Sequence, residues 1–124
     1  MSRGRAVSLG ALAVLFVGAG VMHFVRPRGF VEIVPPALPQ PEALVAISGV
    51  AEILGGLGLL FRRTRRAAAW GLLALLVAVF PANAYMAVAA ERFAHLAPAW
   101  ALWARLPLQP LLMLWVWATA LRDR

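Results

Sequence analysis

The sequence predicts an all-α integral membrane protein, a single domain of residues 1–124 built as a bundle of four helices. Of the 124 residues, 63% are hydrophobic and only 14% are charged. A water-soluble domain of this size must cover most of its surface with polar groups, and this composition cannot do so. Four segments are also free or nearly free of charge, as expected for helices that cross a bilayer.

The four predicted spans follow from these uncharged segments, because a spanning helix needs about 20 apolar residues. The first contains no ionisable group except His23, and the second contains only Glu52. The third and fourth contain none. The segments cover residues 6–24, 43–61, 67–90 and 106–121.

The fourth segment is the shortest, and it can be extended backward to Pro98. A proline suits a helix start because the first turn has no intrahelical partner for its N–H. The extension brings Arg105 into the helix and places Pro107 and Pro110 in its body. Each of these prolines removes a backbone hydrogen bond, so the sequence predicts a kinked or broken fourth helix.

The arginines predict the orientation in the membrane. With four spans, both termini and the loop at 62–66 share one side, which carries eight arginines against four on the other. Cytoplasmic flanks retain positive charge, so both termini and a short inner turn are predicted in the cytoplasm. Arginines placed between apolar runs favour membrane lipids as partners and exclude nucleic acid. The eight are Arg3, Arg5, Arg62, Arg63, Arg65, Arg66, Arg122 and Arg124, and the four are Arg26, Arg28, Arg92 and Arg105.

An alternative concerns the first segment. Its basic start, its apolar run and the triplet Val17-Gly18-Ala19 also fit a cleavable signal peptide. Cleavage would leave three spans, with the termini on opposite sides of the membrane. We favour a span because no polar region interrupts the apolar run before the expected cut.

The predicted outer connections are rich in proline. Residues 25–42 include five prolines, which exclude a regular helix after Val34 and favour a stiff, extended cover. Residues 91–105 mix polar and aromatic side chains. Both connections differ from the inner turn, which is minimal.

Glu52 lies in the middle of the second predicted span. Ionisable residues inside a membrane are costly, and they usually face the protein interior and serve a function. On a helix, Glu52 shares one small and polar face with Ser48, Gly49, Gly55 and Gly56. Such a face lets helices pack closely, and it also leaves room for a ligand or water. Both a structural role and a ligand or proton role for Glu52 therefore remain open.

Four more polar residues reach the same outer half when the spans alternate in direction. His23 ends the first span, Asn83 lies near the outer end of the third, and Arg105 and Gln109 begin the fourth. Arg105 is the only nearby cation that we expect to neutralise Glu52. The five groups predict one site for ligand binding or proton relay. The alternative is a polar network that only fixes the bundle.

Several motifs of catalysis and cofactor binding are missing from the sequence. It has no glycine-rich phosphate loop, no Gly-x-Ser-x-Gly elbow and no His-Glu-x-x-His. His23 and His95 both lie at the predicted outer side of the membrane, and the sequence has no pair of histidines inside the spans on facing helices, which disfavours a haem held by two histidines. The chain has no Cys, which excludes disulfides, thiolate metal sites and iron–sulfur clusters. We expect no metal site, and any redox role must depend on a lipid-soluble cofactor or a partner.

A set of short motifs follows one order along nearly the whole chain: His23-Phe24, Pro27, Phe30, Ile33-Val34-Pro35-Pro36, Leu38-Pro39, Ser48-Gly49 with Glu52, Phe80-Pro81-Ala82-Asn83 and Arg105-Leu106-Pro107-Leu108-Gln109. Their order and spacing resemble the DoxX-like family of small bacterial membrane proteins. The resemblance implies a four-helix protein of the bacterial inner membrane. That family takes its name from a small subunit associated with quinone-linked sulfur oxidation, and most of its members have no assigned reaction. The motif positions implied here are His23, Glu52, Asn83, Arg105 and Gln109.

Three hypotheses for the function follow. The first is a membrane accessory or binding subunit whose outer-half pocket holds a quinone or another lipid-soluble molecule without a covalent bond, together with a redox partner protein. The second is a non-enzymatic structural or assembly protein whose partner docks on the proline-rich cover. The third is a carrier for a small solute, which four spans would provide only as a homo-oligomer.

Overall fold

In the computed structural model, which describes residues 1–122, the chain is all-helical and contains no strand in that range. This confirms the predicted all-α class. Four of the five α-helices are long, and the fifth is a single short helix in the first proline-rich connection. The elements are α1 (Arg3–Val25), α2 (Pro27–Glu32), α3 (Pro41–Leu59), α4 (Arg65–Val88), the 3-10 turn η1 (Ala90–Phe93), α5 (Ala99–Val116) and the π-helical turn η2 (Trp117–Leu121).

Three of the long helices match the first three predicted spans closely. The helices α1, α3 and α4 are long and apolar enough to cross a membrane, as expected for a multi-pass membrane protein. The fourth predicted span corresponds to α5 with η2, but it begins at Ala99, directly after Pro98, as the backward extension predicts. Arg105 and Gln109 therefore lie inside α5, and α5 is not among the three helices that are long and apolar enough to cross a membrane.

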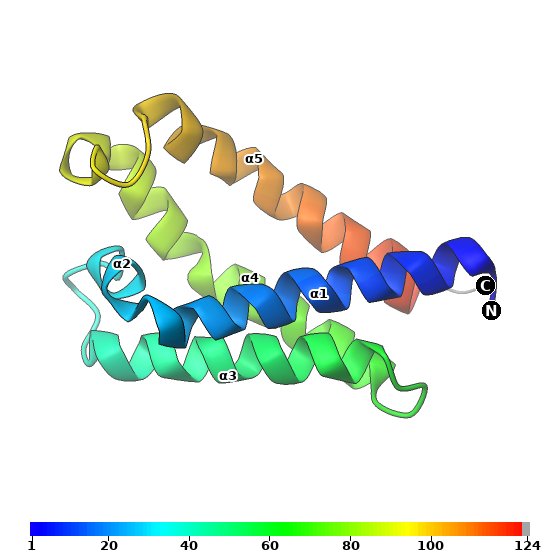
Figure 1. Cartoon of the computed structure of the whole chain (residues 1–124). Helices are drawn as coiled ribbons and strands as arrows, with labels where there is room; N and C mark the ends of the chain where they lie inside the picture. Colours follow the sequence, from blue (N-terminus) through cyan, green and yellow to red (C-terminus); the bar gives the residue numbers. More distant parts are fainter. Residues whose placement is uncertain (123–124) are drawn as a thin grey trace.

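The sequence predicts a kinked or broken fourth helix, and the broken alternative is wrong. The helix α5 continues through Pro107 and Pro110, and Figure 1 shows it as one uninterrupted ribbon. The departure from α-helical geometry comes later, in η2. In the first proline-rich connection, the predicted absence of a regular helix after Val34 is confirmed, because no helix forms between α2 and Pro41. The segment forms turns and not the extended cover that was expected, and the N–H of Leu38 donates to the carbonyl of Pro35.

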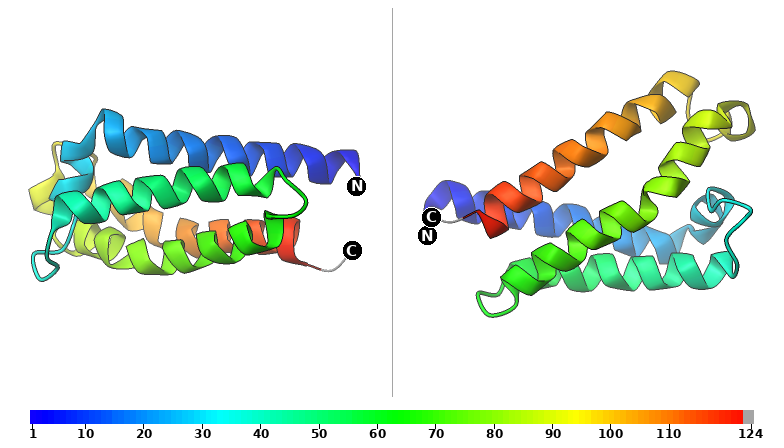
Figure 2. Two further views of the ribbon diagram at one scale, coloured as in Figure 1. Left: turned by 90° about the horizontal axis from the view of Figure 1, so that it is seen from below. Right: turned by 180° about the vertical axis from the view of Figure 1, so that it is seen from behind.

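The long helices form two arms (Figures 1 and 2). The helix α1 packs along α3, α3 packs on α4, and α4 packs on α5. We call α1, α2 and α3 the first arm, and α4, η1 and α5 the second arm. The N-terminus, η2 and the turn between α3 and α4 lie at one end of the molecule, the terminal end. From there the arms diverge toward the opposite end, the cap end, where α2 and η1 lie.

The terminal half contains the larger hydrophobic core. Side chains from both arms meet there, and the most deeply buried include Leu12, Leu59 and Val116, each with no exposed surface. Helices of this length associate in a bilayer through such van der Waals contacts. The cluster consists of Leu9, Leu12, Phe16, Leu59, Ala69, Leu72, Leu76, Val116, Ala120 and Leu121.

Glycines on α3 allow α1 and α4 to approach it closely. A Cβ atom on Gly49 would lie 2.8 Å from the Cβ of His23, and one on Gly55 would lie 2.5 Å from Cδ2 of Leu72. A Cβ atom on Gly56 would also be too close to α1, at 2.9 Å from Cγ2 of Val17. The glycine positions of the small face on α3 are therefore filled by neighbouring helices.

The arms meet again at the cap end, through fewer contacts. Ile33, which follows α2, packs against a small cluster of Met86, Phe93 and Leu102 on the second arm. Nearby, Nε2 of His95 lies 3.1 Å from Oε2 of Glu32, and both side chains are about half exposed. This part of the molecule therefore joins the arms without a large core.

Candidate functional site

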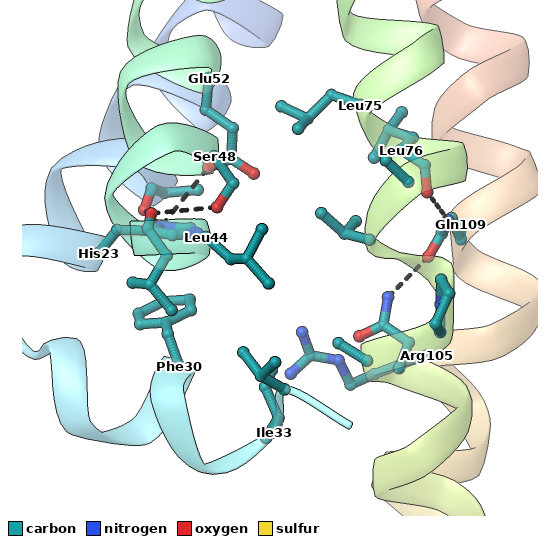
Figure 3. A pocket seen from close by; sticks show the side chains of 18 of the residues that line it. His23, Phe30, Ile33, Leu44, Ser48, Glu52, Leu75, Leu76, Arg105 and Gln109 are labelled. Carbon is teal, nitrogen blue, oxygen red and sulfur yellow. Dashed lines mark hydrogen bonds and ion pairs between the residues drawn. The ribbon is translucent and has the colours of Figure 1, made fainter. Parts of the chain in front are cut away.

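A cavity of about 580 Å³ separates the two arms in the cap half of the molecule (Figure 3). Its walls come from α1 and α3 on one side and from α4 and α5 on the other, and α2 with the segment after it covers the end. The lining is apolar apart from six side chains. These are His23, Ser48, Glu52, Asn83, Arg105 and Gln109, so all five predicted site residues line one cavity.

Glu52 and His23 form the polar part of the first wall. Oε2 of Glu52 lies 3.7 Å from Nδ1 of His23, and the two side chains are 12% and 9% exposed. The same Nδ1 lies 2.7 Å from the carbonyl oxygen of Ala19. Because a carbonyl oxygen only accepts, Nδ1 must carry the proton of this hydrogen bond.

This geometry leaves one acceptor unsatisfied. Oε2 of Glu52 is buried and accepts no hydrogen bond from any residue in 1–122. The hydroxyl of Ser48, one turn away, instead donates to the carbonyl of Val45 at 3.2 Å. A buried oxygen without a donor costs about 1–3 kcal/mol, so a group that enters the cavity and pairs with it is stabilised there.

The ring of His23 is held in place on its other side. It stacks on Phe30 of α2, with the ring centroids 3.9 Å apart and the planes 21° from parallel. The hydrogen bond to Ala19 and this stacking orient the imidazole beside Glu52. With the proton on Nδ1, Nε2 is the ring atom that can accept a second one. The role of Phe30 was not predicted, because sequence spacing does not reveal how α2 folds back.

The small face of α3 was expected either to let helices pack closely or to leave room for a ligand, and the structure assigns different residues to each of these. Gly49, Gly55 and Gly56 contact the neighbouring helices, so they serve close packing and leave no room for a ligand. Ser48 and Glu52 line the cavity instead. The space beside the carboxylate therefore comes from the divergence of the arms.

Asn83 and Gln109 form a polar pair on the second wall. Nδ2 of Asn83 donates to Oε1 of Gln109 at 2.6 Å. Nε2 of Gln109 donates to the carbonyl oxygen of Leu76, within α4. This carbonyl lies near Pro81, which interrupts the hydrogen bonding of α4 because it has no N–H to donate. The pair thus ties α4 to α5 and fixes the orientation of both amides.

Arg105 lies on the second wall, away from Glu52. Figure 3 shows its guanidinium pointing into the space between the walls, while Glu52 lies on the opposite side. Among residues 1–122, the ion pair of Glu52 is with His23, and Arg105 takes part in no salt bridge. The predicted neutralisation of Glu52 by Arg105 is therefore wrong in this structure. The physical reason is that the two residues belong to arms that diverge.

The site therefore has two polar poles across an apolar gap. One pole offers a carboxyl oxygen beside an imidazole, and the other offers a guanidinium beside two oriented amides. No group of three or more His, Cys, Asp or Glu side chains that could hold a metal occurs in the part of the chain that the structure describes. His95 is paired with Glu32 and does not line the cavity.

The comparisons with known proteins give one match. A family model described as "Domain of unknown function (DUF8561)" matches residues 12–120, which include every residue of the two poles. No curated protein and no solved structure is significantly similar to the chain.

Proposed function

Because the chain belongs to the family described as Domain of unknown function (DUF8561), we propose its function from the chemistry of the cavity. We propose that it is a small protein of the bacterial inner membrane that binds a quinone or a similar lipid-soluble molecule between its arms. It would act as a binding or accessory subunit of a redox partner. The observation that carries the proposal is the buried, unsatisfied Oε2 of Glu52 at the wall of an apolar cavity.

The cavity suits a flat apolar ligand with oxygen atoms at two opposite ends. Its volume, about 580 Å³, lies within the usual range of about 300–1,000 Å³ for ligand pockets. Arg105 would donate hydrogen bonds to one oxygen, and Glu52 would pair with the other. A carboxyl group accepts from a hydroxyl when ionised and donates to a carbonyl when protonated, so Glu52 can pair with a quinol or a quinone. His23 would hold its Nδ1–H beside the carboxyl group of Glu52 and take up a further proton at Nε2.

The arrangement of the walls also suits a ligand that arrives through the bilayer. The lining side chains Leu15, Ile47 and Leu108 are exposed, by 44%, 65% and 57%. They come from α1, α3 and α5, so the cavity reaches the apolar outer surface of both arms. A molecule dissolved in the hydrocarbon could therefore enter from the side and leave an isoprenoid tail in the lipid.

A quinone titration tests the proposal. The purified protein in nanodiscs is titrated with a short-chain ubiquinone and a short-chain menaquinone, and bound quinone is measured after removal of the free ligand. Glu52→Gln and Arg105→Gln should each weaken binding about tenfold or more, as expected for loss of a charged hydrogen-bonding group. The matched control is Glu42→Gln, an exposed carboxyl group on the same helix that does not line the cavity. If the wild type binds neither quinone, the proposal fails.

We propose further that α5 with η2 is a fourth span and that both termini lie in the cytoplasm. Seven arginines among the described residues belong to the terminal end, which fits the positive-inside rule. They are Arg3, Arg5, Arg62, Arg63, Arg65, Arg66 and Arg122. Because the chain has no native Cys, single Cys variants report on each end. In intact spheroplasts, an impermeant maleimide should label Glu91→Cys and leave Arg63→Cys unlabelled. The reverse pattern would contradict the orientation.

A structural role for the polar residues is the competing function. The double variant Glu52→Leu/Arg105→Leu separates the two, because apolar side chains of similar size in an apolar cavity need not lower the stability. Under the proposal, this variant folds but loses the quinone. A variant that keeps both quinone binding and partner association would favour the scaffold.

A further inference from the structure

A second cavity, at the terminal end, is surrounded by arginines. It has a volume of about 300 Å³ and is lined by Met1, Arg5, Arg62 and Arg65. The three arginines come from α1, from the turn between α3 and α4, and from the first residue of α4. They are far apart in the sequence, and packing of α1 beside that turn brings them to one place.

Two of these arginines are anchored to the protein backbone. Nε of Arg5 donates to the carbonyl of Thr119 at 2.9 Å. Nε of Arg65 donates to the carbonyl of Leu59 at 2.8 Å, and its Nη2 lies 3.5 Å from the carbonyl of Leu60. The last carbonyls of a helix have no intrahelical partner, so Arg65 caps the C-terminus of α3. Both side chains are half-buried, and their remaining Nη groups are available to another ligand.

The positive charges converge without an acidic partner in the described residues. The charges of Arg5 and Arg62 both act on Arg65. The acids among residues 1–122 are Glu32, Glu42, Glu52 and Glu91, and none of them lines this cavity. The fifth acid, Asp123, lies outside the described residues. Like charges this close repel, so an anion between them would be bound favourably.

We propose that Arg5, Arg62 and Arg65 form a site for the phosphate group of an anionic membrane lipid. Guanidinium groups bind phosphate oxygens through paired hydrogen bonds, and three of them can surround one phosphate. Phe61 and Trp70, which flank the same end of α3 and α4, are 63% and 54% exposed. Exposed aromatic side chains at this level are typical of the membrane interface. The site therefore faces lipid headgroups, which favours a lipid over a soluble phosphate.

Two neighbouring arginines give a matched test. Arg62 lines the cavity and Arg63 does not, both are exposed, and both variants lose one charge from the same turn. Neither side chain caps a helix, so the fold should tolerate each change. Binding of phosphatidylglycerol, with phosphatidylcholine as the neutral reference, is measured by native mass spectrometry of the full chain in detergent.

We expect Arg62→Gln to weaken phosphatidylglycerol binding about tenfold, the effect of one charged hydrogen-bonding group. Arg63→Gln should change it less than about twofold, because Arg63 does not line the cavity and its charge acts on the lipid only through solvent. Equal losses in the two variants would overturn the site and show diffuse attraction instead. Preference for phosphatidylcholine, or no preference, would overturn it as well.

Two further experiments identify the ligand that occupies the site. Inorganic phosphate, titrated alone, should bind more weakly than the lipid; tighter binding would assign the site to a soluble phosphate and overturn the proposal. Asp123→Asn should leave lipid binding within about twofold of the wild type. A rise of about tenfold or more would show that the carboxylate of Asp123 competes with the lipid for the arginines, which would contradict a site open to lipid in the native chain.

Discussion

The terminal half and the cap half of this protein are built from the same four long helices, but their polar groups are arranged differently. In the terminal half, Ser8 and Thr119 pair at 2.8 Å, and Trp115 donates to Ser8 at 2.7 Å. In the cap half, the arms diverge around a cavity, and Oε2 of Glu52 has no hydrogen bond within residues 1–122. The contrast assigns most of the packing to the terminal half, and it fits the proposal that the cap half binds a ligand.

The largest expected effect on the free energy of unfolding comes from a leucine of the terminal core, and a second leucine on α4 serves as its comparison. Leu72 is 1% exposed in the core of the terminal half, whereas Leu75 faces the cavity (Figure 3). Leu72→Ala should lower the free energy of unfolding by about 2–5 kcal/mol, because its packed neighbours cannot fill the space. Leu75→Ala should lower it by less than about 1 kcal/mol, because a cavity already exists there. Unfolding of both variants in mixed micelles with increasing SDS gives the comparison, and equal losses would contradict it.

The next effect concerns the close approach of α1 and α3. Gly49→Ala places a methyl group 2.8 Å from the Cβ of His23 and 3.1 Å from the carbonyl of Gly20. Overpacking of this kind should lower the free energy of unfolding by about 1–3 kcal/mol. It should also weaken quinone binding, because His23 must move.

Gly71→Ala is the control for that substitution. Gly71 lies on α4 with nothing near its Cβ position, so alanine there should raise the stability by up to about 1 kcal/mol through helix propensity. Both variants are measured in the same SDS titration. A stabilising Gly49→Ala would show that α1 and α3 are not in close contact.

A smaller effect is expected from the amide pair. Gln109→Leu removes the partner of both Asn83 and the carbonyl of Leu76. It should lower the free energy of unfolding by about 1–3 kcal/mol, because two groups lose their hydrogen bonds. Thr119→Val, at the terminal end, should lower it by about 1 kcal/mol, because Ser8 keeps its bond to Trp115. A larger loss for Thr119→Val would reverse the assigned roles of the two halves.

The smallest effect concerns the contact between Glu32 and His95, which joins the arms at the cap end. Both side chains are about half exposed, so Glu32→Gln should lower the free energy of unfolding by about 0.5 kcal/mol or less. A loss above about 2 kcal/mol would show that this contact, and not the terminal core, keeps the arms together. The same titration in SDS measures it.

Helix class and approximate span limits could be predicted from the sequence because both depend on local composition. Uninterrupted apolar runs mark α1, α3 and α4, and Pro98 marks the start of α5. The shared location of the five polar residues was also predictable, because alternating spans return to the same side of the membrane. The short helix α2 was not predicted, since its six residues lie in a proline-rich connection.

The partners of these residues could not be predicted in the same way. Spacing along a helix shows which residues share a face, but it does not show how far two helices tilt apart. Glu52 and Arg105 were expected to pair, and the divergence of the arms places them on opposite walls. Glu52 instead lies close to His23, because α1 and α3 pack closely within the first arm. The small glycines indicated a tight contact, but not which helices make it.

The helices α1 and α5 are not packed against each other along their lengths, and they come together only near the termini, through η2 and Ser8. No contact between α1 and α5 therefore fixes the spacing between the two walls of the cavity. If the cavity binds a quinone as we propose, a small change in the angle of the arms would let molecules of different thickness fit between the walls. Selection among them would then depend on the positions of their oxygen atoms relative to Glu52 and Arg105, and only weakly on their width.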